Sequence, residues 1–172
     1  MLEAGGLDAL TMQAVADRVG IRGPSLYKRI DSRSALIAAI AADAFAELGR
    51  EIAAAAGGDD PAEDIRRIAD AYRAFAHRAP QSYGLLFANL APEARPATVE
   101  GARAAAPVLA LAQRWVGPED ALDAARLLTA FVHGFVSMEQ AGAFRLGGDV
   151  ETAWRYGVET LIRGLDAGNA NA

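Results

Sequence analysis

The stretch TMQAVADRVGIRGPSLYKRIDSRSALI, residues 11–37, decides the fold. Thr11 is a residue type that caps helix N-termini, and apolar residues then recur on one side of a short helix, at Val15, Ala16 and Val19. Gly20 can adopt the left-handed conformation that ends a helix and redirects the chain. These signals predict a short helix followed by a tight turn.

A second short helix follows that turn. Pro24 favours a helix start, because a proline in the first turn loses no intrahelical hydrogen bond. Leu26 and Ile30 lie four residues apart, so we expect both to face the first helix. The opposite face then carries polar and basic side chains, namely Ser25, Lys28 and Arg29, with Tyr27 at its edge. Two short helices joined by a glycine turn, the second with an exposed cationic face, are typical of a helix-turn-helix.

The charge distribution fits a helix-turn-helix that binds DNA. The chain has a formal net charge of −5, yet five cations stand against one acid between Arg18 and Arg33, a local +4 that leaves −9 elsewhere. Arg29 can pair with guanine through two hydrogen bonds, and Lys28 and Ser25 can bond to bases or phosphates. Three further side chains suit contacts to the DNA backbone: Thr11, Tyr27 and Arg33.

The same stretch resembles the DNA-binding domain of TetR-family transcriptional regulators. The family pattern T-x-x-x-[LIV]-A-x-x-[LIV]-G-[VI], then L-Y-x-x-[FIV], then [KR]-x-x-L, is filled at every fixed position over residues 11–37. The resemblance implies DNA contacts by Thr11, Met12, Gln13, Gly23, Pro24, Ser25, Tyr27, Lys28, Arg29 and Arg33. Arg22 stands where the family often has a capping Ser or Thr, and we expect it to reach a phosphate.

The resemblance also implies a division of the chain into two domains. Residues 1–46 would form the helix-turn-helix domain, and residues 47–172 a larger helical domain that binds a small molecule and forms a homodimer. Family members begin with a longer helix than Met1 to Ala4 can supply, so we expect the first helix to be present only in part. The stretch from Val132 to Asp149 resembles, more weakly, the C-terminal ligand domain called WHG.

Helical periodicity continues through the rest of the chain, punctuated by Gly and Pro, and predicts an all-α fold with helices over 33–56, 60–77, 81–90, 121–146 and from 150 onward. Aromatic and other large residues at helical spacing either fill the core or line a ligand pocket; the pocket candidates are Tyr72, Phe75, Tyr83, Phe87, Trp115, Phe131, His133 and Met138. Apolar stripes on the last two helices predict a four-helix dimer interface made by Leu128, Val132, Phe135, Trp154, Val158, Leu161, Ile162 and Leu165.

Several classes of protein are disfavoured by composition. The chain has no Cys and only two His, which removes disulfides, thiolate catalysis and Cys-ligated zinc, and we expect no metal site and no cofactor. We find no apolar run long enough for a membrane span and no signal peptide, and therefore expect a cytoplasmic protein. His133 and Glu139 lie on opposite sides of a helix, and no catalytic motif is present, so an enzyme is not expected.

These observations lead to one functional hypothesis and two alternatives. We expect a homodimeric repressor that binds double-stranded operator DNA and is released by a small-molecule effector. A helical protein-interaction adaptor without DNA binding is the first alternative, and a small all-α enzyme is the second.

Overall fold

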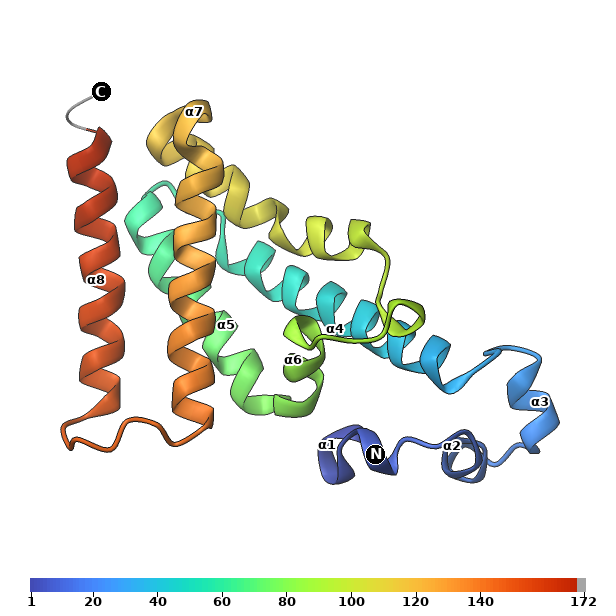
Figure 1. Cartoon of the computed structure of the whole chain (residues 1–172). Coiled ribbons are helices and arrows are strands. Elements are labelled where there is room, and N and C mark those ends of the chain that lie inside the picture. The colour runs from blue at the N-terminus through green and yellow to red at the C-terminus, as the bar shows by residue number, and fades with distance from the viewer. Residues whose placement is uncertain (170–172) are drawn as a thin grey trace.

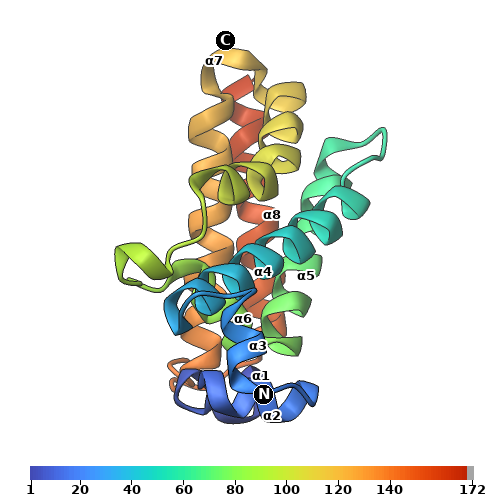
Figure 2. The same cartoon turned by 90° about the vertical axis from the view of Figure 1, so that its right-hand side faces the viewer.

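The computed structural model describes residues 1–169, and every regular element in that range is helical. The N-terminal part contains α1 (Leu2–Gly5), the 3-10 turn η1 (Leu7–Ala9), α2 (Met12–Val19) and α3 (Gly23–Tyr27). Helix α4 (Arg33–Ala55) then runs obliquely from these short helices across the larger C-terminal part (Figures 1 and 2). The predicted all-α architecture is confirmed.

The C-terminal part is built from α5 (Pro61–Arg78), α6 (Pro80–Phe87), the 3-10 turn η2 (Pro92–Ala94), α7 (Thr98–Gln140) and α8 (Val150–Asn169). Helix α7 bends sharply at Gly117, whose φ of 81° and ψ of 171° are open to glycine but strained for other residues. Its second half runs antiparallel to α8 (Figure 1). No helix within residues 1–169 combines the length and apolar character needed to cross a bilayer.

The local signals of the N-terminal stretch act as expected. The Thr11 hydroxyl accepts a hydrogen bond from the Ala14 N–H, and Gly20 ends α2 in the left-handed conformation with φ 71° and ψ 30°. Val19 differs from its prediction, because it is 58% exposed rather than turned toward the second helix. Helix α3 has only five residues and closes on α2 through Leu26, so the last turn of α2 is left uncovered.

Two large apolar cores form, beside a small cluster of Ala112, Ala121 and Ala124 at the bend of α7. The N-terminal core contains Leu10, Ala16, Leu26 and Ile37, and it extends to Leu85 of α6. The C-terminal core is larger and joins α4 to α8. Because α6 contributes to the N-terminal core, the short helices are packed onto the C-terminal part rather than tethered by α4 alone.

Helices α4 and α7 approach very closely at Gly49. A Cβ placed on Gly49 would lie 2.9 Å from the Cα of Ala104, so no larger residue fits without a backbone shift. The two helices therefore touch backbone to backbone at this position.

The predicted helix over 121–146 is wrong at its C-terminal end. Helix α7 stops at Gln140, and the connection to α8 contains Gly142, Gly147 and Gly148, all with positive φ. Leu146 in this connection is fully exposed, so the apolar residues here do not extend a buried stripe.

Candidate DNA-binding surface and ligand cavity

The predicted recognition helix presents its polar side chains to solvent. Ser25 and Tyr27 are exposed, while Leu26 between them is buried against α2 and anchors the helix. The exposed residues flank a helix start formed by Gly23 and Pro24. This arrangement leaves one polar face of the helix free, and such a face can enter the major groove of DNA.

Lys28 and Arg29 are exposed as predicted, but they lie in the turn that follows α3 rather than on the helix. The N–H groups of Arg29 and Ile30 both bond to the Leu26 carbonyl, which tightens the chain at this point. Within residues 1–169, the side chains of Arg22, Lys28 and Arg29 enter no ion pair.

Two residues that the family resemblance implied as DNA contacts have structural roles instead. The Met12 side chain is buried in the N-terminal core and therefore cannot reach outward. Arg33 donates from Nε to the Leu10 carbonyl at 2.8 Å and from Nη2 to the Leu7 carbonyl at 2.5 Å. It ties the start of α4 to η1, so its guanidinium is already engaged.

The remaining contact candidates on α2 lie at its exposed N-terminus. The Thr11 hydroxyl caps the helix, and Gln13 donates from Nε2 to the Asp17 carboxylate at 2.7 Å. Both side chains are exposed, and so is that of Arg22. The first turn of α2 and the α3 region therefore form one exposed surface, here called the cationic surface: Thr11, Gln13, Arg22, Ser25, Tyr27, Lys28 and Arg29.

A cavity of about 190 Å³ lies in the C-terminal part, among α4, α5, both halves of α7 and α8. Three of the predicted pocket residues line it: Tyr72, Phe87 and Phe131. The other five do not. Phe75 and Trp115 are buried in the core, Met138 is 48% exposed, and Tyr83 and His133 lie behind Phe87.

Much of the lining comes from residues that the sequence did not single out as pocket candidates, including residues of the first half of α7, where no helix was predicted. Helix α4 contributes Leu48 and Ile52, α5 contributes Ile65 and Ile68, and the first half of α7 contributes residues such as Val108. Their periodicity is the same as that of ordinary core residues, so the sequence carries no signal that singles them out.

The predicted dimer interface requires correction. Of the residues assigned to it, Leu128, Val132, Trp154, Val158 and Ile162 are buried within the protomer, and Phe135, Leu161 and Leu165 pack against the same core. Trp154 donates from Nε1 to Asp70 at 2.8 Å and stacks against Phe131. Most of the stripe of α8 is covered by α5 and α7 of its own chain.

The Tyr72 hydroxyl is buried and has no hydrogen-bond partner in the described structure. Burial raises the pKa of Tyr72, and the neighbouring Tyr83 raises it further, so the hydroxyl stays protonated. The Tyr83 hydroxyl is instead paired with Nδ1 of His133 at 2.6 Å. Tyr72 lines the cavity, and its buried hydroxyl interacts with Tyr83 but makes no hydrogen bond of ordinary geometry.

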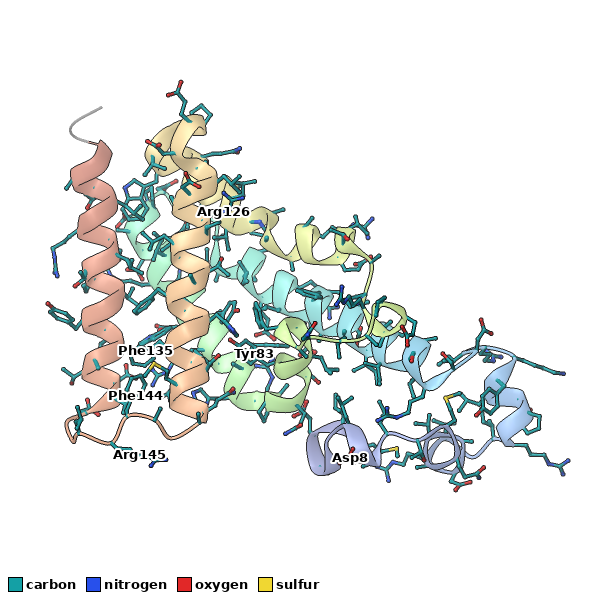
Figure 3. All side chains as sticks on the ribbon, in the orientation of Figure 1. Asp8, Tyr83, Arg126, Phe135, Phe144 and Arg145 are labelled. Atoms are coloured by element: carbon teal, nitrogen blue, oxygen red, sulfur yellow. The ribbon has the colours of Figure 1, made fainter. Side chains whose placement is uncertain are left out.

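Phe87 lines the cavity from α6, and His133 packs against the Phe87 ring. The two rings stack with centroids 3.8 Å apart, and Tyr83 projects from α6 toward His133 (Figure 3). Burial lowers the pKa of His133, so the ring is neutral at neutral pH. His133 and Glu139 do not form a pair, because Glu139 bonds instead to Arg73 and His77.

Helix α6 also contacts the N-terminal helices. The Glu3 carboxylate accepts hydrogen bonds from the N–H groups of Gln81 and Ser82, at 3.0 and 2.8 Å, and from the Ser82 hydroxyl at 2.7 Å. Burial opposes ionisation, but these hydrogen bonds outweigh it and lower the pKa of Glu3. One short helix thus carries Phe87 at the cavity and is capped by a residue of α1.

Two family models match separate parts of the chain. Residues 1–40 match the family described as bacterial regulatory proteins of the tetR family, and residues 65–161 match the tetracycline repressor-like C-terminal domain. The uncharacterized HTH-type transcriptional regulator Rv0681 of Mycobacterium tuberculosis is 33% identical over 147 residues, which cover 82% of this chain and 66% of the relative, just under two thirds of its length.

Solved structures show the same fold. The regulatory protein SCO4313 is 28% identical, with a TM-score of 0.77, and the match covers 93% of this chain and 88% of that one. A TetR variant from Acinetobacter baumannii in complex with minocycline is 22% identical with a TM-score of 0.70, covering 96% and 90%. Family and fold are those of transcriptional regulators, not of enzymes. The chain is a member of the TetR family of transcriptional regulators, with an N-terminal DNA-binding domain and a C-terminal ligand-binding domain.

Proposed function

We propose that this regulator is a homodimeric repressor that binds operator DNA through its cationic surface and is released when a small-molecule effector occupies the cavity. The observation that carries the proposal is the position of α6, which lines the cavity through Phe87 and is held by Glu3 of α1. A ligand that shifts α6 acts on both domains.

The residues of the cationic surface would make two kinds of contact, to base edges and to the DNA backbone. Ser25, Lys28 and Arg29 would contact base edges in the major groove, because these side chains can donate to guanine or bond to either base type. Thr11, Gln13, Arg22 and Tyr27 would contact the DNA backbone and fix the register. Two subunits would bind half-sites about 34 Å apart, one helical turn of DNA.

The homodimer would form through the outer face of the second half of α7 and of α8. Leu127, Met138 and Tyr156 are large apolar residues that remain exposed on these helices. Exposed apolar side chains on two adjacent antiparallel helices suit a four-helix interface across a two-fold axis. Leu127→Arg combined with Tyr156→Arg should give monomers in sedimentation velocity. Val99→Arg, at another exposed apolar position, should leave the dimer intact.

The domain boundary would lie within α4, with residues 1–46 serving DNA binding and residues 47–172 serving ligand binding and dimerisation. Helix α4 is continuous from Arg33 to Ala55 and carries cavity residues on both sides of this boundary, Phe45 before it and Leu48 and Ile52 after it. A ligand that binds better to one orientation of α4 and α6 shifts the population of DNA-binding dimers, and a coupling of about 1–3 kcal/mol is typical.

The DNA-binding proposal is tested with fragments selected by the wild-type protein from genomic DNA of its source. Lys28→Ala combined with Arg29→Ala should weaken binding to the selected fragments at least tenfold in fluorescence anisotropy and reduce the preference for them over unrelated DNA. The matched control is Arg103→Ala with Arg126→Ala, two exposed arginines outside the cationic surface. Figure 3 labels Arg126.

Unchanged affinity of the Lys28/Arg29 variant would overturn the assignment of the cationic surface. If the wild-type protein selects no DNA at all, the adaptor alternative is favoured instead.

A further inference from the structure

We propose that the cavity binds a neutral, predominantly apolar molecule of about six to ten non-hydrogen atoms, with one polar atom that hydrogen-bonds to the Tyr72 hydroxyl. This inference rests on the proposed ligand site and specifies the chemistry of its occupant.

The walls of the cavity exclude a charged ligand. The side chains that line it are aliphatic and aromatic apart from Tyr72 and Thr129, and none of the described lining residues is ionisable in the physiological range. A carboxylate or ammonium group would leave water without a counter-charge to pair with, which is strongly unfavourable. A neutral ligand avoids this penalty.

The volume sets the size of the ligand. At about 190 Å³ the cavity is only slightly larger than an apolar cavity of about 150 Å³ that is sufficient for benzene. A molecule with one aromatic ring and a short substituent fills such a space, whereas a drug-sized ligand needs roughly 300 Å³ or more.

The Tyr72 hydroxyl determines where the polar atom lies. The side chain is 6% exposed and its hydroxyl has no partner, while Tyr83 is occupied by His133. A buried donor without an acceptor is unfavourable, so a ligand with an acceptor atom regains that free energy on binding. We expect a ligand with a carbonyl oxygen to bind about tenfold more tightly than the matching hydrocarbon.

The mouth of the cavity lies near Ala105 and Phe87, because these are its exposed lining residues. Ala105 is on the surface of α7, so a bulky side chain there can obstruct access without disturbing the core. Ala106 is the next residue, is also exposed and does not line the cavity, which makes it a matched control position.

The test uses three probes of similar size: acetophenone, ethylbenzene and benzoate. Isothermal titration calorimetry on the full chain should show acetophenone binding most tightly, ethylbenzene about tenfold more weakly, and no binding of benzoate at pH 7.5. Trp154 stacks on the lining residue Phe131 with ring centroids 5.7 Å apart, so tryptophan fluorescence gives a second readout.

Two substitutions assign the binding to the cavity. Tyr72→Phe should reduce acetophenone affinity to that of ethylbenzene and leave ethylbenzene affinity unchanged. Ala105→Trp should weaken binding of both probes at least tenfold, and Ala106→Trp should not. Circular dichroism melts confirm that each variant is folded.

The proposal is overturned if benzoate binds as tightly as acetophenone, if neither neutral probe binds, or if Tyr72→Phe leaves the preference for acetophenone intact. Its failure is distinguishable from failure of the proposed function. Acetophenone that binds in the cavity but does not release DNA from the wild-type protein supports the ligand chemistry and contradicts the effector mechanism.

Discussion

Arginines in the two domains are used in opposite ways. In the DNA-binding domain, Arg22 and Arg29 are exposed and enter no ion pair within residues 1–169. In the ligand-binding domain, Arg66 bonds to Glu159 of α8 at 2.6 Å, and Arg73 bonds to Glu139 and Glu151. Cations left unpaired are available to an external polyanion, whereas paired cations fix helices to one another.

The comparison explains how a chain of net charge −5 can carry a DNA-binding surface. Residues 1–46 hold five cations and five acids, so the net charge of −5 belongs to residues 47–172, and the cationic surface keeps its own local potential. Net charge alone would have argued against nucleic acid.

The largest expected effect is on the free energy of unfolding, and it distinguishes an ion-paired arginine from an unpaired one. Arg73 and Glu139 are both mostly buried, with side-chain exposures of 17% and 16%, and Arg73 also lies over the Trp154 ring. Arg73→Met should lower the free energy of unfolding by about 2 kcal/mol, because Glu139 then keeps only its hydrogen bond with the exposed His77.

Urea denaturation measures this loss. Arg29→Met is the matched control and should change the free energy of unfolding by less than about 0.5 kcal/mol while weakening DNA binding. Equal destabilisation by the two variants would contradict the contrast between the domains.

The second effect sharpens the comparison within the ligand-binding domain, between a hydroxyl with a partner and one without. Tyr83→Phe removes a hydrogen bond to His133 and should destabilise the protein by about 1 kcal/mol. Tyr72→Phe removes an unpaired buried hydroxyl and should stabilise it by about 1 kcal/mol. Thermal melts of the two variants should shift in opposite directions, and two shifts of the same sign would show that Tyr72 is not unpaired in solution.

A third effect concerns the contact between α1 and the start of α6, which connects the two domains. Glu3→Gln keeps the shape of the side chain but removes the charge that accepts hydrogen bonds from the start of α6. DNA affinity without ligand should be retained, and the decrease in DNA affinity on ligand binding should shrink several-fold. Glu93→Gln, at an exposed carboxylate on η2, is the control. If ligand binding lowers the DNA affinity of Glu3→Gln as much as that of the wild-type protein, the Glu3 contact does not couple the two sites.

The smallest effect is a pH dependence. Burial lowers the pKa of His133 in the folded state, while the unfolded chain has the ordinary value of 6.5. The unfolded state therefore binds the proton more readily, so stability falls as the pH drops from 6.5 toward the folded-state pKa. The wild-type protein should lose more stability than His133→Asn between pH 7 and pH 5.5 in urea titrations; parallel curves would show that His133 does not contribute.

Sequence reasoning was most successful where the determinants are local. The cap at Thr11, the left-handed turn at Gly20 and the helix start at Pro24 each depend on a few neighbouring residues, and all three are confirmed. The placement of Lys28 and Arg29 on a helix was wrong, because the length of a five-residue helix is set by packing around Leu26.

The cavity could not be predicted in the same way. Val158 and Leu161 belong to a clean apolar stripe on α8, and periodicity identifies such a stripe without saying which surface covers it. We assigned the stripe to a partner subunit, whereas α5 and α7 of the same chain cover it and leave the cavity between them. The empty space depends on how long-range neighbours pack, which a single sequence does not show.

The contact between Gly49 and Ala104 gives α4 a mechanical property. Gly49 lies 16 residues beyond Arg33, so an arm of about 24 Å extends from this fulcrum to the DNA-binding end, against about 5 Å to Ile52 on the other side. A tilt of only about 5° around Gly49 would carry Arg33 through about 2 Å while Ile52 moved by about 0.4 Å. Under the proposed mechanism, a ligand would need to displace the cavity wall only slightly to move the start of α4 by several times that distance.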